Sequence, residues 1–314
     1  MYTITMDYIE FGKNKTKVSK LILGLMRTSD LSTEQIATLA NTALDQGINY
    51  FDTADCYGNG KAESQLGLTF EQNPGLRNKV FLQSKCGIRN ENGLTWYDFS
   101  EDYILQAVDS SLSRLKTDHL DSLLLHRPDA LMEPEEIASA FEKLKKSGKV
   151  LNFGLSNCNP MTMELIRRYI NEPICANQVQ FSVAHTPMID SSLQVNMKWD
   201  GATMRDGGIL EYCKMNNIAV QAWSTMQYGY FEGIYINSEK YPHLNQVLYR
   251  IASEHNVSAN AVALAWILRH PANMQAVIGT TNPNRIQESA RCTDFTLSKK
   301  EWYELYQASG NRLP

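Results

Sequence analysis

The sequence lacks the signals of several protein classes. Its six cysteines are spread over 314 residues without a C-x-x-C pair or a metal-ligand spacing, so neither a disulfide framework nor a zinc site is predicted. The most apolar run, residues 261–268, is far shorter than the roughly 20 residues needed to cross a bilayer. No G-x-G-x-x-G follows the first predicted strand, which excludes the usual fingerprint of a dinucleotide-binding open sheet.

Charge of one sign is also missing. Thirty Lys and Arg against 34 Asp and Glu give a formal net charge of -4, and no basic tract is present, so neither a nucleic acid nor a membrane surface is a predicted partner. The first 14 residues include acidic side chains and no apolar signal-peptide core, so we expect a cytoplasmic protein. The oligomeric state stays open, with a monomer favoured.

Short apolar runs alternate with helical patterns along the chain, which is typical of a parallel sheet with crossover helices. The predicted strands are residues 21–24, 48–52, 80–85, 121–126, 152–156, 178–181, 219–223 and 275–278. The predicted helices are residues 32–47, 62–70, 101–115, 134–147, 160–170, 208–216 and 282–291, with two more helical segments before the eighth strand. Eight such units predict an α/β fold, a (β/α)8 TIM barrel that forms a single domain over residues 1–314.

Two stretches are too long for minimal connections between a strand and a helix. Residues 183–203 and 224–241 interrupt the repeat. Loops of this length commonly carry function. We therefore expect these two loops, together with the C-terminal segment, to shape the substrate pocket.

Ionisable residues end three successive predicted strands. Asp52, Lys85 and His126 stand at these ends, and Tyr57 follows in the next loop. Each residue alone has a structural explanation: a turn cap, a surface ion pair or a satisfied core histidine. Since the carboxyl ends of barrel strands form one rim, where barrel enzymes hold their active sites, the three together indicate a catalytic site.

Six motifs in order along the chain resemble the aldo-keto reductases. They are DTADCYGNG from residue 52, QSKCG from 83, LLLHRPD from 123, GKVLNFGLSN from 148, NQVQFS from 177 and IGTTNPNRIQES from 278. The resemblance covers nearly the whole chain. It implies a catalytic tetrad of Asp52, Tyr57, Lys85 and His126, and a nicotinamide cofactor bound without a Rossmann fold.

The chemistry of carbonyl reduction suits these residue types. A carbonyl that receives hydride develops negative charge on its oxygen, and Tyr57 could supply a proton there. Lys85 is expected to lower the pKa of that phenol, while Asp52 keeps Lys85 charged and oriented. His126 could hold the carbonyl oxygen or help to move the proton, and the sequence does not divide these duties. No metal is required.

The resemblance also implies a binding site for the nicotinamide. Ser156, Asn157 and Gln178, which starts the predicted sixth strand, match positions that hold the carboxamide, and Trp223 matches an aromatic residue against the ring. Met26 and Ser224 are further expected cofactor contacts. The alternative interpretations are helix-entry turn chemistry for Ser156 and Asn157, and a core aromatic for Trp223.

The last motif lies between the eighth strand and its helix, where barrels often hold phosphate. The resemblance assigns Thr280 and Arg285 to the adenosine 2'-phosphate and Glu288 to the adenine amino group, with a solvated helix face as the alternative. Gly279 replaces a lysine that many members carry. We therefore expect NADPH as the cofactor, with NADH as a weaker alternative.

The predicted activity is the NADPH-dependent reduction of an aldehyde or ketone, a small-molecule carbonyl substrate, to the alcohol. Two alternatives stay open: a lyase that uses Lys85 as a Schiff-base nucleophile, and a non-catalytic NADPH-sensing subunit. Three cysteines adjoin the predicted site, Cys56, Cys86 and Cys158. We interpret them as small filling residues that are open to oxidation.

Overall fold

A closed parallel barrel organises the chain. The computed structural model describes residues 6–314. Residues 1–5, which belong to the predicted domain, lie outside the described residues. Within the described part, eight strands close in the order β10, β11, β12, β3, β4, β5, β8, β9. They are β3 (Leu21–Gly24), β4 (Tyr50–Asp52), β5 (Phe81–Cys86), β8 (Ser122–Leu125), β9 (Phe153–Ser156), β10 (Ile174–Gln180), β11 (Ala219–Trp223) and β12 (Met274–Ile278). The predicted TIM barrel is confirmed.

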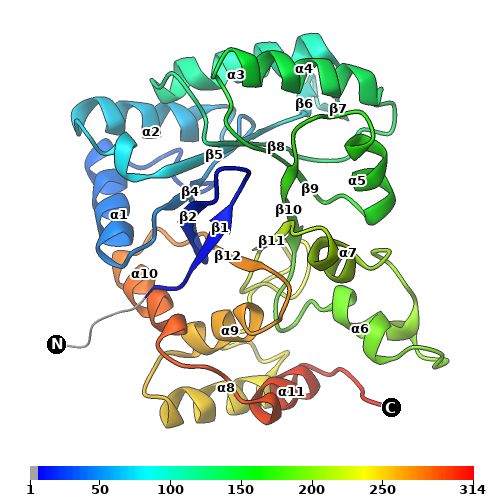
Figure 1. Ribbon diagram of the computed structural model, residues 1–314. Helices are drawn as coiled ribbons and strands as arrows, with labels where there is room; N and C mark the ends of the chain where they lie inside the picture. Colours follow the sequence, from blue (N-terminus) through cyan, green and yellow to red (C-terminus); the bar gives the residue numbers. More distant parts are fainter. Residues whose placement is uncertain (1–5) are drawn as a thin grey trace.

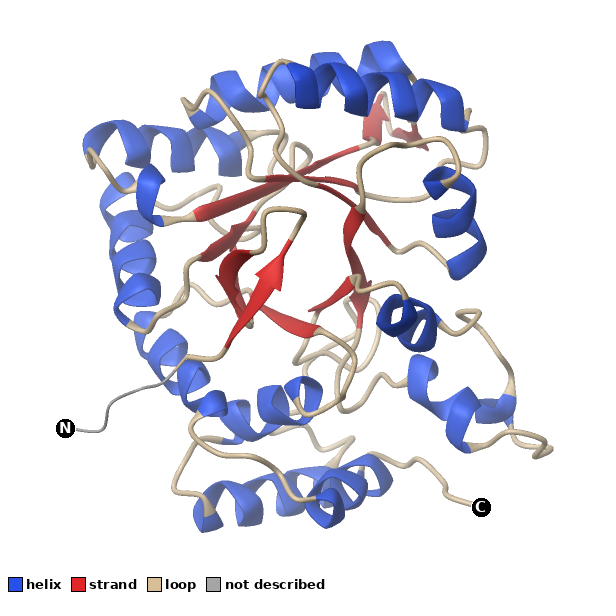
Figure 2. Ribbon diagram, in the orientation of Figure 1, coloured by secondary structure: helices blue, strands red, loops and turns tan. Residues whose placement is uncertain are grey.

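Helices surround the barrel, as Figure 1 and Figure 2 show. They are α1 (Thr33–Asp45), α2 (Lys61–Gln72), α3 (Glu101–Leu115), α4 (Pro134–Lys146), α5 (Pro160–Arg167), α7 (Ile209–Met215), α8 (Pro242–Glu254), α9 (Ala259–Leu268) and α10 (Pro283–Ala290). Local sequence sets several of their starts: Ser32 and Gln35 form the predicted capping box of α1, and Asn282 caps α10.

The most apolar run of the sequence falls in α9, which is buried on nearly all sides. Trp266 of α9 and Trp302 stack at 4.8 Å between ring centroids, and each indole donates a hydrogen bond to the other residue's carbonyl. Trp302 belongs to α11 (Lys299–Ala308), a helix that the sequence analysis did not predict. Across residues 6–314, no helix combines the length and the apolar character needed to span a membrane.

Two hairpins were also not predicted. One pairs β1 (Tyr8–Phe11) with β2 (Thr16–Ser19), and the other pairs β6 (Ile88–Glu91) with β7 (Leu94–Tyr97). The first lies across the barrel in Figure 1. Its Phe11 packs on Tyr50 and Phe81, the first residues of β4 and β5, with ring centroids 5.6 and 5.3 Å away. The hairpin therefore closes the amino end of the barrel, and the carboxyl end is left for a ligand.

The interpretation of residues 183–203 as a pocket loop is wrong in this structure. This stretch contains α6 (Pro187–Leu193) and a 3-10 turn (Asp200–Ala202), and none of its residues lines the cleft described below. Asp190 instead accepts a hydrogen bond from Tyr306, and Asn311 donates one to Thr186. The segment therefore packs on the C-terminal residues, which are likewise absent from the cleft wall.

Candidate active site

A cleft of about 760 Å³ opens at the carboxyl ends of the barrel strands. Every predicted site residue except Lys85 lines it: Met26, Asp52, Tyr57, His126, Ser156, Asn157, Gln178, Trp223, Ser224, Gly279, Thr280, Arg285 and Glu288. Lys85 lies directly beneath and is fully buried. Residues 224–241 supply a large part of the wall, as expected for that loop. The structure thus gathers into one site residues from all eight barrel strands or from the loops that follow them.

Three of the predicted catalytic side chains form a chain of contacts. The Nζ atom of Lys85 lies 2.7 Å from Oδ2 of Asp52 and 3.3 Å from the hydroxyl oxygen of Tyr57, and it also donates to the carbonyl of Thr53 at 2.8 Å. Both charged groups are almost entirely shielded from water. A buried ion pair is stable only when its geometry is good and its remaining hydrogen bonds are satisfied, and this pair meets both conditions.

The charge state of the pair follows from these contacts. Burial alone would lower the pKa of the Lys85 ammonium, but Asp52 and Tyr57 raise it above its ordinary value. Lys85 is therefore a cation at neutral pH, with a hydrogen pointing at the phenol.

The expected net effect on Tyr57 is wrong in this structure. Burial raises the pKa of Tyr57 to about 12, and the Lys85 charge only partly offsets this effect. Lys85 lowers the pKa of Tyr57, as predicted, but burial raises this pKa by more than Lys85 lowers it. Tyr57 is consequently a neutral phenol at physiological pH, able to donate its proton.

His126 completes the group at one side of Tyr57. The two rings meet edge to face with centroids 5.8 Å apart, and Nδ1 of His126 lies 3.6 Å from Sγ of Cys56. Burial, together with the nearby charges of Lys85 and Arg127, holds the pKa of His126 well below its ordinary value. The imidazole is therefore neutral and keeps one N–H donor and one acceptor.

A layer of glutamines supports Asp52 from below. Gln83 and Gln178 both donate from Nε2 to Oδ1 of Asp52, at 2.7 and 3.1 Å, and both also donate to Oε1 of Gln221. Gln221 in turn donates to Gln275 and to the hydroxyl of Tyr50. Strand register explains the layer, because Asp52 is paired with Gln83, and Gln178 with Gln221. Inward positions of neighbouring strands therefore lie at one height in the barrel.

Sequence reasoning missed most of this layer and misplaced one member of it. Gln178 was predicted to start its strand, but β10 begins at Ile174, so Gln178 lies near the carboxyl end. The start of β10 is hard to recognise in the sequence, because the polar Asn177 interrupts its apolar run. The buried side chain of Asn177 bonds the backbone of Cys158, donating to the carbonyl at 2.8 Å and accepting from the amide at 3.3 Å. The available signal was a glutamine that recurs inside four buried strands, β5, β10, β11 and β12.

Asn157 joins the ends of β8, β9 and β11. Its Nδ2 donates to the carbonyl of His126 and to Oγ of Ser156, and its Oδ1 accepts from Nε1 of Trp223 at 3.0 Å. The backbone of Asn157 is left-handed, with φ of 59°, a conformation that asparagine tolerates better than most residues. These bonds fix the indole of Trp223 at the cleft wall.

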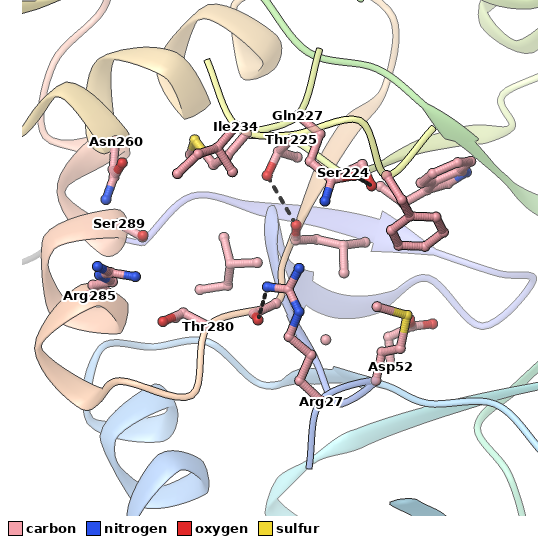
Figure 3. A pocket seen from close by; sticks show the side chains of 18 of the residues that line it. Arg27, Asp52, Ser224, Thr225, Gln227, Ile234, Asn260, Thr280, Arg285 and Ser289 are labelled. Atoms are coloured by element: carbon pink, nitrogen blue, oxygen red, sulfur yellow. Dashed lines mark hydrogen bonds between the residues drawn. The ribbon is translucent and has the colours of Figure 1, made fainter. Parts of the chain in front are cut away.

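Ser224 continues the same wall with φ of 53°. Unlike Asn157, it is a residue type that rarely adopts this backbone, and such conformations cluster at functional sites. Its hydroxyl donates to Oε1 of Gln227 at 2.9 Å, and the next residue, Thr225, donates to the carbonyl of Val277. Both bonds are drawn in Figure 3. The first bond lies within the 224–241 loop, and the second attaches the start of that loop to β12.

The far end of the cleft lies at the start of α10. Asn282 caps this helix, and its amide donates to Oγ1 of Thr280, so the loop keeps a fixed shape. Figure 3 shows Arg285 and Ser289 on the helix with Asn260 across from them. Gly279 has open space where a side chain would stand. Asn260 and Ser289 were not predicted from the sequence.

Arg27 is the most informative residue that sequence reasoning missed. It follows β3 and extends between Thr280 and Asp52 in Figure 3. Its Nη1 donates to the carbonyl of Gly279 at 3.3 Å. This chain has Gly279 where many family members have a lysine, but Arg27, from the loop after β3, places a cation beside that position. Only the closure of the barrel brings residues 27 and 279 together.

The three cysteines near the site have the properties of filling residues. All six cysteines are free thiols. Burial raises the pKa of Cys56 and of Cys158 to about 12, and it raises that of Cys86 well above the ordinary value. Reactive cysteines show the opposite shift. Across residues 6–314, no three or more His, Cys, Asp or Glu side chains gather in a way that could hold a metal ion.

Comparisons with known proteins agree with this site. The profile of the Aldo/keto reductase family matches residues 20–309. A 6-dehydroglucose reductase of Agrobacterium fabrum is 33% identical over 303 residues, which cover 93% of this chain and 95% of that protein. Oxidoreductase YdhF of Escherichia coli is 30% identical, with 93% of each chain covered. A solved thermostable aldo-keto reductase in complex with the inhibitor epalrestat superposes with a TM-score of 0.77 at 26% identity, covering 96% of this chain and all of the other.

These matches extend over nearly the full length of both chains and include each strand that contributes to the cleft. They also agree with the barrel closure and with the motifs that first pointed to carbonyl reduction. The chain therefore belongs to the aldo/keto reductase family, and the predicted enzyme class and cofactor, an NAD(P)H-dependent oxidoreductase, are confirmed.

Proposed function

We propose that the protein reduces a small aldehyde or ketone to the alcohol with NADPH, and that Tyr57 donates the proton. One observation carries this proposal: a single buried ammonium, Lys85, contacts both the Asp52 carboxylate and the Tyr57 hydroxyl at the wall of the cleft. The bound cofactor supplies a hydride to the carbonyl carbon. What the chain must supply is a proton for the oxygen and a fixed position for the substrate.

Tyr57 suits the first task because it is neutral and hydrogen-bonded to a cation. As the carbonyl oxygen takes up the phenolic proton, negative charge develops on the Tyr57 oxygen, and the Lys85 ammonium 3.3 Å away stabilises it. Asp52 balances the charge of Lys85 and holds its Nζ in place. The two glutamines that bind Asp52 keep that carboxylate from turning.

His126 suits the second task. A neutral imidazole can donate one hydrogen bond to a carbonyl oxygen without a charge that would have to be desolvated. Its position beside Tyr57 lets both groups reach one oxygen atom. His126 is therefore assigned to substrate positioning, and Tyr57 to proton transfer.

The raised pKa of Tyr57 gives reduction and the reverse reaction different pH dependences. Reduction needs the protonated phenol, which predominates below the pKa of about 12. Alcohol oxidation needs the phenolate, whose fraction rises about tenfold per pH unit below that pKa. We expect reduction to show no loss from Tyr57 ionisation between pH 6 and 9, and oxidation to accelerate steeply over the same range.

The cleft residues fit the parts of the cofactor by their chemistry. Ser156, Asn157 and Gln178 offer hydroxyl and amide groups for the carboxamide, Trp223 offers a ring face for the nicotinamide, and Met26 and Ser224 line the space between. At the other end, Thr280 and Arg285 suit the 2'-phosphate, the open backbone at Gly279 lets it approach, and Glu288 suits the adenine amino group. We add Arg27 as a cation for the phosphates between the two ends.

The lyase alternative conflicts with the charge of Lys85. A Schiff-base nucleophile must be a free amine, whereas Asp52 keeps this lysine protonated. Treatment with borohydride in the presence of an aldehyde separates the two functions. We expect no covalent adduct on Lys85, and an adduct there would support the lyase.

The decisive experiment follows NADPH oxidation at 340 nm with sugar aldehydes, aromatic aldehydes, quinones and keto esters. We include 6-dehydroglucose because a relative has the name of its reductase. Turnover of at least one class is expected, together with its loss in Lys85→Met at saturating NADPH. A protein that binds NADPH with high affinity but reduces none of these compounds would instead be a cofactor sensor.

A further inference from the structure

Arg127 has an unusual environment in the cleft. It follows His126 directly at the end of β8 and lines the same cavity. Its guanidinium lies over the indole of Trp223 at 5.6 Å and over the ring of Tyr230 at 5.8 Å. The two rings meet edge to face with centroids 6.2 Å apart, so the three side chains form one compact group. We call it the Arg127 group.

Stacking satisfies the face of a guanidinium and leaves its N–H groups free. These five donors lie in the plane of the group, so they point outward from a stacked ring. Within residues 6–314, Arg127 donates no hydrogen bond and forms no ion pair with a carboxylate. The side chain is nevertheless half-buried, where an unpaired cation loses part of its hydration.

Another arginine shows how this chain completes such a group. Arg89 also stacks on two aromatic rings, those of Trp96 and Tyr103, each at 5.0 Å. Unlike Arg127, it forms an ion pair with Asp98 at 2.9 Å. Both arginines stack on two aromatic rings. Arg89, outside the cleft, has an acidic partner, whereas Arg127, inside the cleft, has none among residues 6–314.

The charges of the cleft sharpen this contrast. Three arginines line it, although the whole chain has a net charge of -4. Arg27 and Arg285 lie toward the phosphate end, where the proposed cofactor brings negative charge. Arg127 lies at the opposite end, beside His126 and Trp223, and its cationic charge contributes to the lowered pKa of His126. The cofactor phosphates thus leave Arg127 without a counter-charge.

We propose that Arg127 binds an oxyanion of the substrate, so that the physiological substrate is a small aldehyde or ketone carrying a carboxylate, sulfonate or phosphate group. The inference rests on the proposed function and adds the chemical class of its substrate. The guanidinium fork pairs with two oxygens of the anion, while Trp223, Tyr230 and Ile88 contact the body of the molecule. This pairing holds the carbonyl against His126 and Tyr57.

The test compares substrates that differ only in charge. 4-Carboxybenzaldehyde is paired with methyl 4-formylbenzoate, the 3-substituted isomers form a second pair, and succinate semialdehyde with its methyl ester forms a flexible third pair. We expect at least one acid to exceed its ester in kcat/KM by about tenfold or more. Charge-assisted hydrogen bonds of about 1.5–3 kcal/mol predict that Arg127→Met lowers this ratio by about 10-fold to 100-fold. Arg127→Lys, which keeps the charge but not the fork, should lie between.

General damage to the enzyme lowers kcat/KM for the acid and for the ester alike, so it leaves their ratio unchanged. Arg89→Met is the matched control because it removes a stacked arginine outside the cleft. That control should keep the wild-type ratio. A second readout needs no turnover: calorimetry on the NADP-loaded protein should show that the acid alcohol, 4-(hydroxymethyl)benzoate, binds more tightly than its methyl ester, and that Arg127→Met removes the difference.

Two results would overturn the proposal. One is that the ester equals or exceeds its acid in all three pairs, and the other is that Arg127→Met changes the best ratio less than threefold. Either result leaves carbonyl reduction intact, since the esters are themselves aldehydes. Failure of the proposed function looks different: neither acids nor esters are reduced, although the calorimetric comparison still reports on Arg127.

Discussion

The two ends of the cleft are built on different physical principles. At the proposed nicotinamide end, Asp52 and Lys85 are buried on strands and bonded to each other, and Asp52 is also bonded to neighbouring glutamines. At the proposed phosphate end, Arg27 and Arg285 extend from a loop and from a helix start into an open space. The first end has its polar partners within the protein. The second end keeps its cations exposed and without a carboxylate partner among residues 6–314, which supports the proposal that a ligand phosphate binds there.

This difference indicates where each kind of precision is needed. Proton transfer depends on distances that change its rate when they shift by fractions of an ångström, and rigid strands supply such positions. Binding a phosphate needs charge and a fork of donors, which long side chains on a loop can adjust. Substitutions at the first end should therefore affect rate, and those at the second end should affect affinity.

The largest expected effect is that of Tyr57→Phe. Removing the proton donor should lower kcat for carbonyl reduction by about 100-fold or more. The NADPH dissociation constant should stay within about threefold, because the lost hydroxyl contacts Lys85 rather than the phosphate end. Stopped-flow turnover and calorimetry measure the two quantities. Tyr212→Phe, an α7 tyrosine that bonds Glu164 outside the cleft, is the control.

A Tyr57→Phe variant that keeps its turnover would remove the phenol from the mechanism. If NADPH affinity fell together with kcat, the division between the two ends would also fail.

The sequence was sufficient for the rigid end of the cleft because that end follows strand periodicity. Asp52 and Lys85 each end an apolar strand, and barrel closure alone places such ends on one rim. The glutamine layer was within reach for the same reason, since Gln83, Gln178 and Gln221 occupy inward positions of their strands.

The open end could be predicted only in part. Arg285 lies within a motif, but Arg27 reaches Gly279 across 252 positions of sequence, a contact that no local pattern reports. The segment of residues 183–203 failed for a related reason. Its length indicated a functional loop, while its position depends on side-chain bonds to the C-terminal residues, such as the bond between Tyr306 and Asp190.

Arg285→Ala tests the phosphate end with the next largest effect. Losing a charge-assisted fork should weaken NADPH binding by about 10-fold to 100-fold, and NADH binding should hardly change, because NADH has no 2'-phosphate. Titration of both cofactors by tryptophan fluorescence gives the comparison. Arg291→Ala, which removes the arginine paired with Asp294 just beyond α10, is the matched control. Equal losses for NADPH and NADH would contradict the assignment of Arg285.

Asp55 is the exception to the rule that polar groups at the rigid end have partners. Its Oδ1 atom is buried without a hydrogen bond, and Oδ2 has only a long contact of 3.4 Å from Tyr103. Burial and the nearby Glu63 raise the pKa of Asp55 to about 7, while Arg114 partly offsets them. The native protein therefore holds a proton that the unfolded chain releases near pH 4.

The sign of the pH dependence follows. A raised carboxyl pKa contributes stability that is fully present below the unfolded value and is lost as pH rises through about 7. The slope between pH 5 and 7 is at most about 1.4 kcal/mol per unit. Urea unfolding at each pH should show that Asp55→Asn removes this decline, while the exposed control Asp118→Asn keeps it. Parallel curves for wild type and Asp55→Asn would mean that Asp55 is ionised throughout.

Gly279→Lys should give the smallest effect and sharpen the comparison most finely. The space beside Gly279 is open and its backbone φ is not positive, so a lysine fits without strain. A solvated cation near Thr280 should add up to about 1 kcal/mol to NADPH binding, a gain of a few-fold in the preference over NADH. Arg27 limits the gain, because its guanidinium already lies at the Gly279 carbonyl and repels a second cation. Gly279→Gln separates charge from side-chain length, and in the background of Arg27→Met the lysine should contribute more than in the wild type. A lysine that contributes equally in both backgrounds would show that Arg27 does not share the phosphate site.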